Sequence, residues 1–170
     1  QTYFPYKGFL AMAIFPLTYF CFYFLSLLSE EQNSMRELKE TMPCSFTYLV
    51  SLRMLYTSLL HILMNNILFL SIFREEKHIW SISATGTTAL LLFSLVSLIL
   101  YEKNSSANGS IALLTLWSIG CLYLSKYGSP LHHLVIEVIP FLVHAGTAAF
   151  SFILLLLYIR KVEKQYAYSI

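Results

Sequence analysis

Long apolar blocks separated by short polar joints are the dominant pattern of this sequence. Gly8 to Leu28 runs for about 21 residues without a charge, and a helix of ~20 residues crosses the ~30 Å hydrocarbon core of a bilayer. Phe46 to Phe73 and Ile79 to Tyr101 are two further blocks of spanning length. Trp80 and Tyr101 bracket the latter block about 32 Å apart as a helix, the separation of the two interfacial aromatic belts. These blocks predict three transmembrane helices.

The fourth block is short, and its length decides the number of spans. Ile111 to Leu124 holds only about 14 residues, below the usual minimum for a crossing, and approaches spanning length only if it is extended through Tyr127. The sequence Gly-Ser-Pro at 128–130 then predicts a helix break and a turn. The fourth block is therefore a short span, a re-entrant arm or a segment lying on the membrane surface.

The last block, Leu131 to Ile159, is long enough to cross at a tilt, with a kink expected at Pro140. Together the blocks predict an all-α fold, a polytopic transmembrane helix bundle with four or five spans that forms one domain over residues 1–170. Because the chain begins at Gln1 rather than Met, we expect that a segment precedes it.

Composition supports a membrane protein and excludes several other classes. Hydrophobic residues make up 57% of the 170 residues and charged residues 12%, against about 25% charged residues in soluble domains. The net charge of +2 comes without any basic run, so no nucleic-acid partner is predicted. The chain contains no Asp and no HExxH, GxSxG, Walker or CxxC sequence, which removes the commonest hydrolase, phosphoryl-transfer and redox motifs.

Two topology rules disagree about the orientation. With five spans, the positive-inside rule favours an outside N-terminus, and the cationic C-terminal residues Arg160, Lys161 and Lys164 are then cytoplasmic. This places the glycosylation sequons at Asn104 and Asn108 in the cytosol. With four spans both termini are inside and both sequons are outside. The two sequons in one loop indicate a lumenal face, and hence a glycoprotein of a eukaryotic endomembrane or plasma membrane.

Polar side chains form two stripes within the predicted spans. In the second block the residues stand four apart and therefore share one helix face: Arg53, Thr57, His61 and Asn65. In the last block the spacings are four and seven, with Pro140 on the same face: His133, Glu137, His144 and Ser151. Ionisable groups in a bilayer are costly and usually face a partner or a watery cavity.

The depths of the two stripes match in the four-span alternative. There both helices run parallel, with Arg53 and Glu137 roughly 10 and 9 Å below their entrances and His61 and His144 roughly 22 and 20 Å below. In the five-span alternative the helices are antiparallel, and Arg53 and Glu137 lie near opposite faces. Arg53, His61, Asn65, Glu137 and His144 thus form a candidate intramembrane polar site. The competing interpretation is that they snorkel or serve as interhelical hydrogen-bond partners.

No cofactor and no metal site are predicted as the main interpretation. A haem ligated by His61 and His144 is an alternative, because two histidines on facing helices can bind iron axially. A metal at His132, His133 and Glu137 is a weaker one, since adjacent histidines point in different directions.

Three functions fit these residues. The first is a non-catalytic or accessory subunit of a larger membrane assembly, with the lipid bilayer and other membrane-protein subunits as partners. Short loops, the small residues of the third block and the missing catalytic motifs favour it. The second is an enzyme acting on a lipid or lipid-linked substrate at Arg53, His61, Glu137 and His144. The third is a transporter or channel component that uses the same polar residues as a path.

Overall fold

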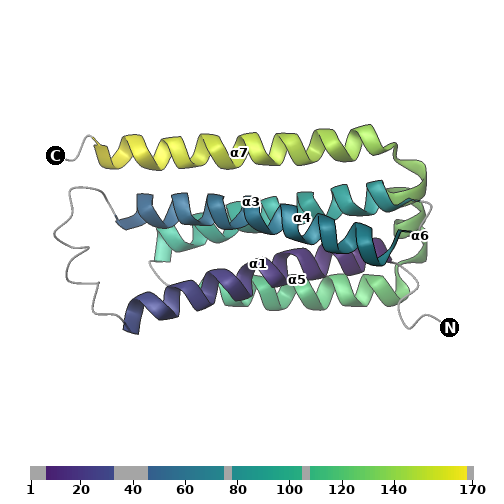
Figure 1. Cartoon of the computed structure of the whole chain (residues 1–170), viewed down its shortest axis with the longest axis horizontal. Coiled ribbons are helices and arrows are strands. Elements are labelled where there is room, and N and C mark those ends of the chain that lie inside the picture. The colour runs from purple at the N-terminus through teal and green to yellow at the C-terminus, as the bar shows by residue number, and fades with distance from the viewer. Residues whose placement is uncertain (1–6, 33–45, 75–77, 105–107, 168–170) are drawn as a thin grey trace.

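The computed structural model describes residues 7–32, 46–74, 78–104 and 108–167, and almost all of them are helical (Figure 1). The predicted all-α transmembrane bundle is confirmed, because five helices are long and apolar enough to cross a bilayer. These helices are α1 (Lys7–Gln32), α3 (Phe46–Ile72), α4 (Ile79–Asn104), α5 (Asn108–Tyr127) and α7 (Phe141–Ala167).

The length of helix α5 favours five spans over four, because it adds a fifth candidate span among the described residues. The apolar block from Ile111 to Leu124 is extended at both ends, so that the helix reaches 20 residues. Its added ends are polar, with Asn108, Gly109 and Ser110 before the apolar block and Ser125 to Tyr127 after it. A helix of 20 residues is ~30 Å long, which matches the hydrocarbon core.

Successive long helices run in opposite directions along the bundle (Figure 1). The joint between α4 and α5, which follows Asn104, therefore lies at the end of the bundle where α7 finishes. The last turns of α7 carry Arg160, Lys161 and Lys164 at that same end. The sequons and the cationic C-terminal turns thus share one end, and the two topology rules still point to opposite orientations.

Helix α4 is the centre of the bundle and packs against α1, α3, α5 and α7. Of its span residues 67% are buried, against 22% in α3, 17% in α5 and 22% in α7. The small residues at its start allow this close packing: a Cβ at Gly86 would lie 2.9 Å from the Phe15 ring of α1. The small residues of α4 thus serve close packing within the chain. Aromatic and aliphatic side chains fill the core between α1, α3, α4 and α7, among them Phe15, Tyr19, Met54, Leu90, Phe93 and Leu155.

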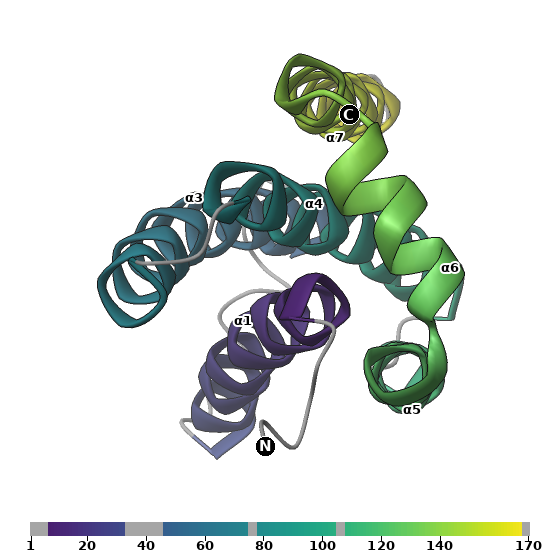
Figure 2. The same cartoon turned by 90° about the vertical axis from the view of Figure 1, so that its right-hand side faces the viewer.

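The last apolar block is not one kinked helix, as the sequence predicted, but two helical segments in different directions. Helix α6 (Ser129–His132) continues into the π-helix η1 (His133–Val138), and this segment crosses the end of the bundle from α5 to α7 (Figure 2). Ile139 is extended, with φ −74° and ψ 125°, because a residue before proline is disfavoured in the helical region. Pro140 therefore separates the crossing segment from α7.

The break predicted at Gly-Ser-Pro is confirmed, and its cause is steric. Helix α5 ends at Tyr127, and a Cβ at Gly128 would lie 2.5 Å from the carbonyl oxygen of Leu124. Only glycine allows the chain to turn there. The crossing segment then packs on the start of α1, where Ile136 covers Gly8 and the His132 ring meets Phe9 edge-on at 6.1 Å.

Candidate functional site

The polar stripe of α3 faces α1. The Asn65 side chain donates a hydrogen bond from Nδ2 to Thr18 Oγ1 at 2.9 Å. One turn away, the His61 ring lies 6.1 Å from the Tyr19 ring and 4.9 Å from the Phe22 ring. His61 and Asn65 are both buried. His61 and Asn65 of the predicted face thus lie at a contact between α3 and α1.

His61 also makes a hydrogen bond within its own helix. Its Nδ1 lies 2.8 Å from the carbonyl oxygen of Thr57. That oxygen is the regular acceptor of the His61 backbone N–H, four residues later in the helix. The imidazole bond therefore fixes the ring orientation, and the carbonyl has a backbone partner without it.

Asn66, beside the stripe, ties α3 to α4 rather than to α1. Its Nδ2 donates to the Ile62 carbonyl at 2.7 Å and to Thr87 Oγ1 at 3.2 Å, and its Oδ1 accepts from Ser83. Sequence reasoning did not place Asn66 in a site. Two consecutive asparagines in an apolar helix were the signal, since neighbouring positions point about 100° apart and reach different neighbours.

Arg53 and Glu137 lie towards opposite ends of the bundle. Arg53 is half-buried in the first two turns of α3, and Glu137 belongs to η1, near the end where α3 finishes (Figure 1). The antiparallel course of α3 and α7 thus separates the two residues, as the five-span alternative predicted. His61 and Asn65 of α3 both contact α1, and Glu137 lies away from this contact.

Glu137 pairs with a histidine on its own segment, at the end of the bundle outside the spans. Its Oε2 lies 2.7 Å from His133 Nδ1, and both side chains are exposed. The hydrogen bond from His133 lowers the pKa of the Glu137 carboxyl below its usual value, with smaller contributions of the same sign from nearby His132 and His78. The pair is an exposed surface contact, of a kind that contributes little to stability.

The His144 side chain supplies a hydrogen bond that the backbone of Pro140 cannot donate. In η1 the Ile139 N–H bonds to the Leu134 carbonyl, five residues earlier, at 3.2 Å. The next donor in this π-helical pattern would be residue 140, but proline has no N–H. The Val135 carbonyl instead accepts from His144 Nε2 at 2.7 Å. His144 is buried and closes the break between η1 and α7.

The same arrangement occurs at Pro16, within α1. Pro16 cannot donate to the carbonyl of Met12, four residues earlier. That carbonyl accepts from the Trp117 indole Nε1 of α5 at 2.9 Å. In a bilayer a free carbonyl is costly, so a neighbouring helix supplies the donor. Sequence reasoning missed this pair, although a proline inside a long apolar block was a signal for it.

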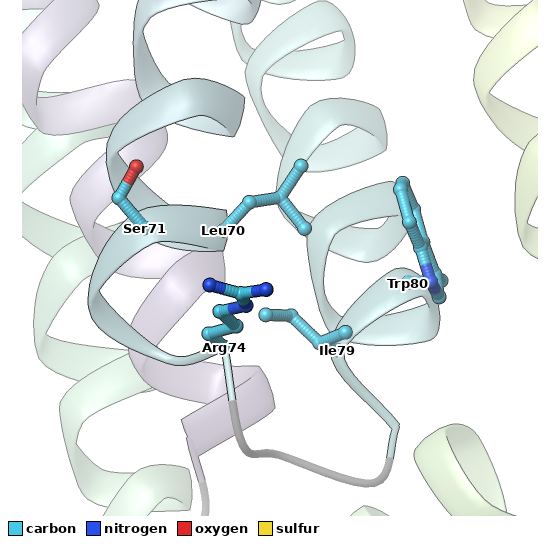
Figure 3. A pocket seen from close by; sticks show the side chains of 5 residues that line it. All are labelled: Leu70, Ser71, Arg74, Ile79 and Trp80. Carbon is cyan, nitrogen blue, oxygen red and sulfur yellow. The ribbon is translucent and has the colours of Figure 1, made fainter.

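An open hollow of about 540 Å³ lies where α3 ends and α4 begins (Figure 3). Its described lining residues come from both helices and the turn between them: Leu70, Ser71, Arg74, Ile79 and Trp80. None of them belongs to the predicted polar site. The hollow faces outwards, since Arg74 and Trp80 are exposed.

The positions of the histidines do not test the haem alternative. Within the described ranges no three His, Cys, Asp or Glu side chains are arranged to hold a metal ion. One ring nitrogen each of His61 and His144 is bonded to a backbone carbonyl, on α3 and on η1 respectively. Haem ligation by these two residues stays a prediction from sequence. No protein family, curated protein or solved structure matches this chain.

Proposed function

We propose that this protein is a non-catalytic accessory subunit of a larger membrane assembly. The observation that carries the proposal is the dispersal of the polar side chains within the spans. Asn65 bonds to α1, Asn66 to α4 and His144 to η1. Polar groups used in this way stabilise helix contacts. The enzyme and transporter alternatives formulated on His61, Glu137 and His144 would instead require these residues to converge on one cavity.

Helix α7 has a large surface that is open to a partner helix. It packs on α4 and, less extensively, on α3, and only 22% of its span residues are buried. Its remaining surface is available to lipid or to a helix of another subunit. Apolar composition alone does not distinguish these two neighbours, so the shape of the surface matters.

The exposed side of α7 has the shape of a helix-packing seam. Leu142, Gly146, Ala149 and Ile153 are spaced by four, three and four residues, so they share one face. All four are exposed, and a Cβ at Gly146 would meet no atom within 4 Å. Two small residues between two large ones allow the backbone of a second helix to approach closely.

Gly120 of α5 is also in open space, but its neighbours on the helix face differ from those of Gly146. A Cβ at Gly120 would also meet no atom within 4 Å, but the positions one turn away on the same side are Leu116 and Tyr123, both large and exposed. The Tyr123 side chain, which stands where α7 has Ala149, would hold a second helix at a distance. Gly120 is therefore a matched control for Gly146.

The test is the size of the assembly after extraction from native membranes in a mild detergent. Gly146→Leu should shift the protein from a high-mass species to the free subunit, while Gly120→Leu should leave the high-mass species intact. Helicity and the unfolding midpoint of the purified subunit should be unchanged in both variants. A purified wild-type protein that is monodisperse alone and turns over a lipid would overturn the proposal. An unaltered assembly size in Gly146→Leu would exclude α7 as its docking helix.

Glycosylation and an endomembrane or plasma-membrane location remain part of the proposal. Asn104 ends α4 and Asn108 begins α5, so both sequons sit at one end of the bundle. Modification at either position would place that end in the lumen. The wild-type protein should lose mass on treatment with a glycosidase, and Asn104→Gln or Asn108→Gln should remove part or all of this loss. A full-length wild-type protein whose mass does not change on glycosidase treatment would contradict the proposal.

A further inference from the structure

The hollow between α3 and α4 combines one cationic group with apolar walls. Figure 3 shows the Arg74 guanidinium lying between Leu70 and Ile79. The Trp80 indole lies farther from Arg74, on the α4 side of the hollow. The Ser71 hydroxyl donates to the Ile67 carbonyl of its own helix at 2.7 Å. Among the described residues, no side chain accepts a hydrogen bond from Arg74.

The position of the hollow along the bundle is that of a membrane interface. The span in α3 ends at Ile72 and the span in α4 begins at Ile79. Arg74 therefore follows one span by two residues, and Trp80 lies in the first turn of the next. Tryptophan is enriched at the level of the lipid headgroups, and 61% of the Trp80 side chain is exposed.

We propose that this hollow binds the phosphodiester headgroup of a membrane glycerophospholipid. Guanidinium groups bind phosphate through two parallel charge-assisted hydrogen bonds. The apolar side chains of Leu70 and Ile79 suit the glycerol and the first methylene groups. A volume of about 540 Å³ lies within the ~300–1,000 Å³ of small-molecule sites. The headgroup and the upper part of the chains fit, and the lower chains extend along α3 and α4.

The lipid is favoured over other occupants by the neighbourhood of the hollow. Free phosphate would gain nothing from contact with the apolar side chains of Leu70 and Ile79. In the described part of the chain no carboxylate pairs with Arg74, so a partner helix that covered this guanidinium would have to supply an acid. A bilayer phospholipid supplies an anionic phosphate and apolar chains at this depth.

The experiment is native mass spectrometry of the detergent-solubilised full chain with short-chain lipids. Dioctanoyl phosphatidylglycerol and dioctanoyl phosphatidylcholine should both bind, since both carry the phosphodiester. Dioctanoylglycerol and inorganic phosphate should not. Arg74→Gln should weaken lipid binding about tenfold, as expected for losing a hydrogen bond to a charged group. Arg160→Gln is the matched control, because Arg160 is also exposed but belongs to the last turns of α7.

The remaining outcomes each decide against the proposal. Unchanged lipid binding in Arg74→Gln would place the lipid elsewhere. Equal binding of dioctanoylglycerol would show an apolar groove only, and binding of inorganic phosphate at the same concentration would show an anion site only. Arg74→Gln should keep the wild-type helicity and unfolding midpoint, because the side chain is exposed. This test does not depend on the proposed accessory role.

Discussion

The bond between Trp117 and the Met12 carbonyl should depend on Pro16. In the wild-type protein the carbonyl has lost its backbone donor to proline, and the indole takes that place at 2.9 Å. Trp117→Phe removes the donor and leaves the carbonyl unsatisfied. Pro16→Ala restores a backbone N–H four residues after Met12. In the Pro16→Ala background the loss of the indole should therefore matter less.

The size of this dependence follows from the surroundings of the bond. An unsatisfied buried polar group costs ~1–3 kcal/mol in soluble proteins, whereas side-chain hydrogen bonds between membrane helices average ~0.6 and reach ~1.7 kcal/mol. Met12 and Trp117 are both half-buried, and no bulk water replaces the donor within the bilayer. We expect a coupling free energy of about 1 kcal/mol, a factor of about five in the unfolding equilibrium.

A double-mutant cycle measures this coupling directly. Wild type, Trp117→Phe, Pro16→Ala and the double variant are unfolded in micelles with increasing dodecyl sulfate, followed by circular dichroism. The cycle cancels the packing lost in each single variant. Trp80→Phe gives the matched control, since Trp80 is the other tryptophan and is exposed at the start of α4. Its coupling to Pro16 should be zero.

Nuclear magnetic resonance gives a second measurement on the same variants. The Trp117 indole N–H should resonate downfield of the Trp80 signal and exchange slowly, and Pro16→Ala should shift it. The reasoning is refuted if the coupling free energy between Trp117 and Pro16 lies within ~0.3 kcal/mol of zero, the usual range for independent sites. An indole signal unaffected by Pro16→Ala would refute it as well.

Three further predictions each concern the contacts of one residue. Gly86→Ala should destabilise the bundle by ~1–3 kcal/mol because its Cβ would enter an aromatic ring of α1, whereas Gly146→Ala, in open space, should not lower the unfolding midpoint. Asn66→Leu should cost about 1 kcal/mol in detergent unfolding by removing two contacts to α4. The carboxyl of Glu137 should titrate below the usual pKa in carbon-13 spectra, and His133→Ala should raise it. The stabilisation from this lowered pKa is present above the usual glutamate pKa and is lost as the pH falls through the folded value; an unchanged titration in His133→Ala would contradict the assignment.

The fold class could be predicted because each spanning helix satisfies its own backbone, so the length of an apolar block predicts a helix locally. Helix α5 was underestimated because its apolar core, Ile111 to Leu124, is shorter than the helix that contains it. Hydropathy alone did not show that Asn108 to Ser110 would be helical.

The candidate site was predictable only where one helix is unbroken. The α3 stripe stays on one face because α3 runs without interruption from Phe46 to Ile72. The second stripe was extrapolated with helical periodicity across Pro140, and the structure divides it there, with Glu137 in η1 and His144 in α7. Periodicity carries no information across a break of unknown angle. The neighbours of each stripe depend on helix packing, which no single span encodes.

Replacing the buried histidines His61 and His144 should have different effects on stability. His144→Phe leaves the Val135 carbonyl without its donor and should destabilise the protein by ~1–3 kcal/mol. His61→Phe keeps an aromatic ring at this position, and the Thr57 carbonyl retains its backbone donor, so the unfolding free energy should change by less than ~1.5 kcal/mol. His61 thus allows structure and chemistry to be separated. An assembly that works normally with His61→Phe is expected for an accessory subunit. Lost activity in a stably folded His61→Phe protein would instead favour chemistry at the contact between α1 and α3.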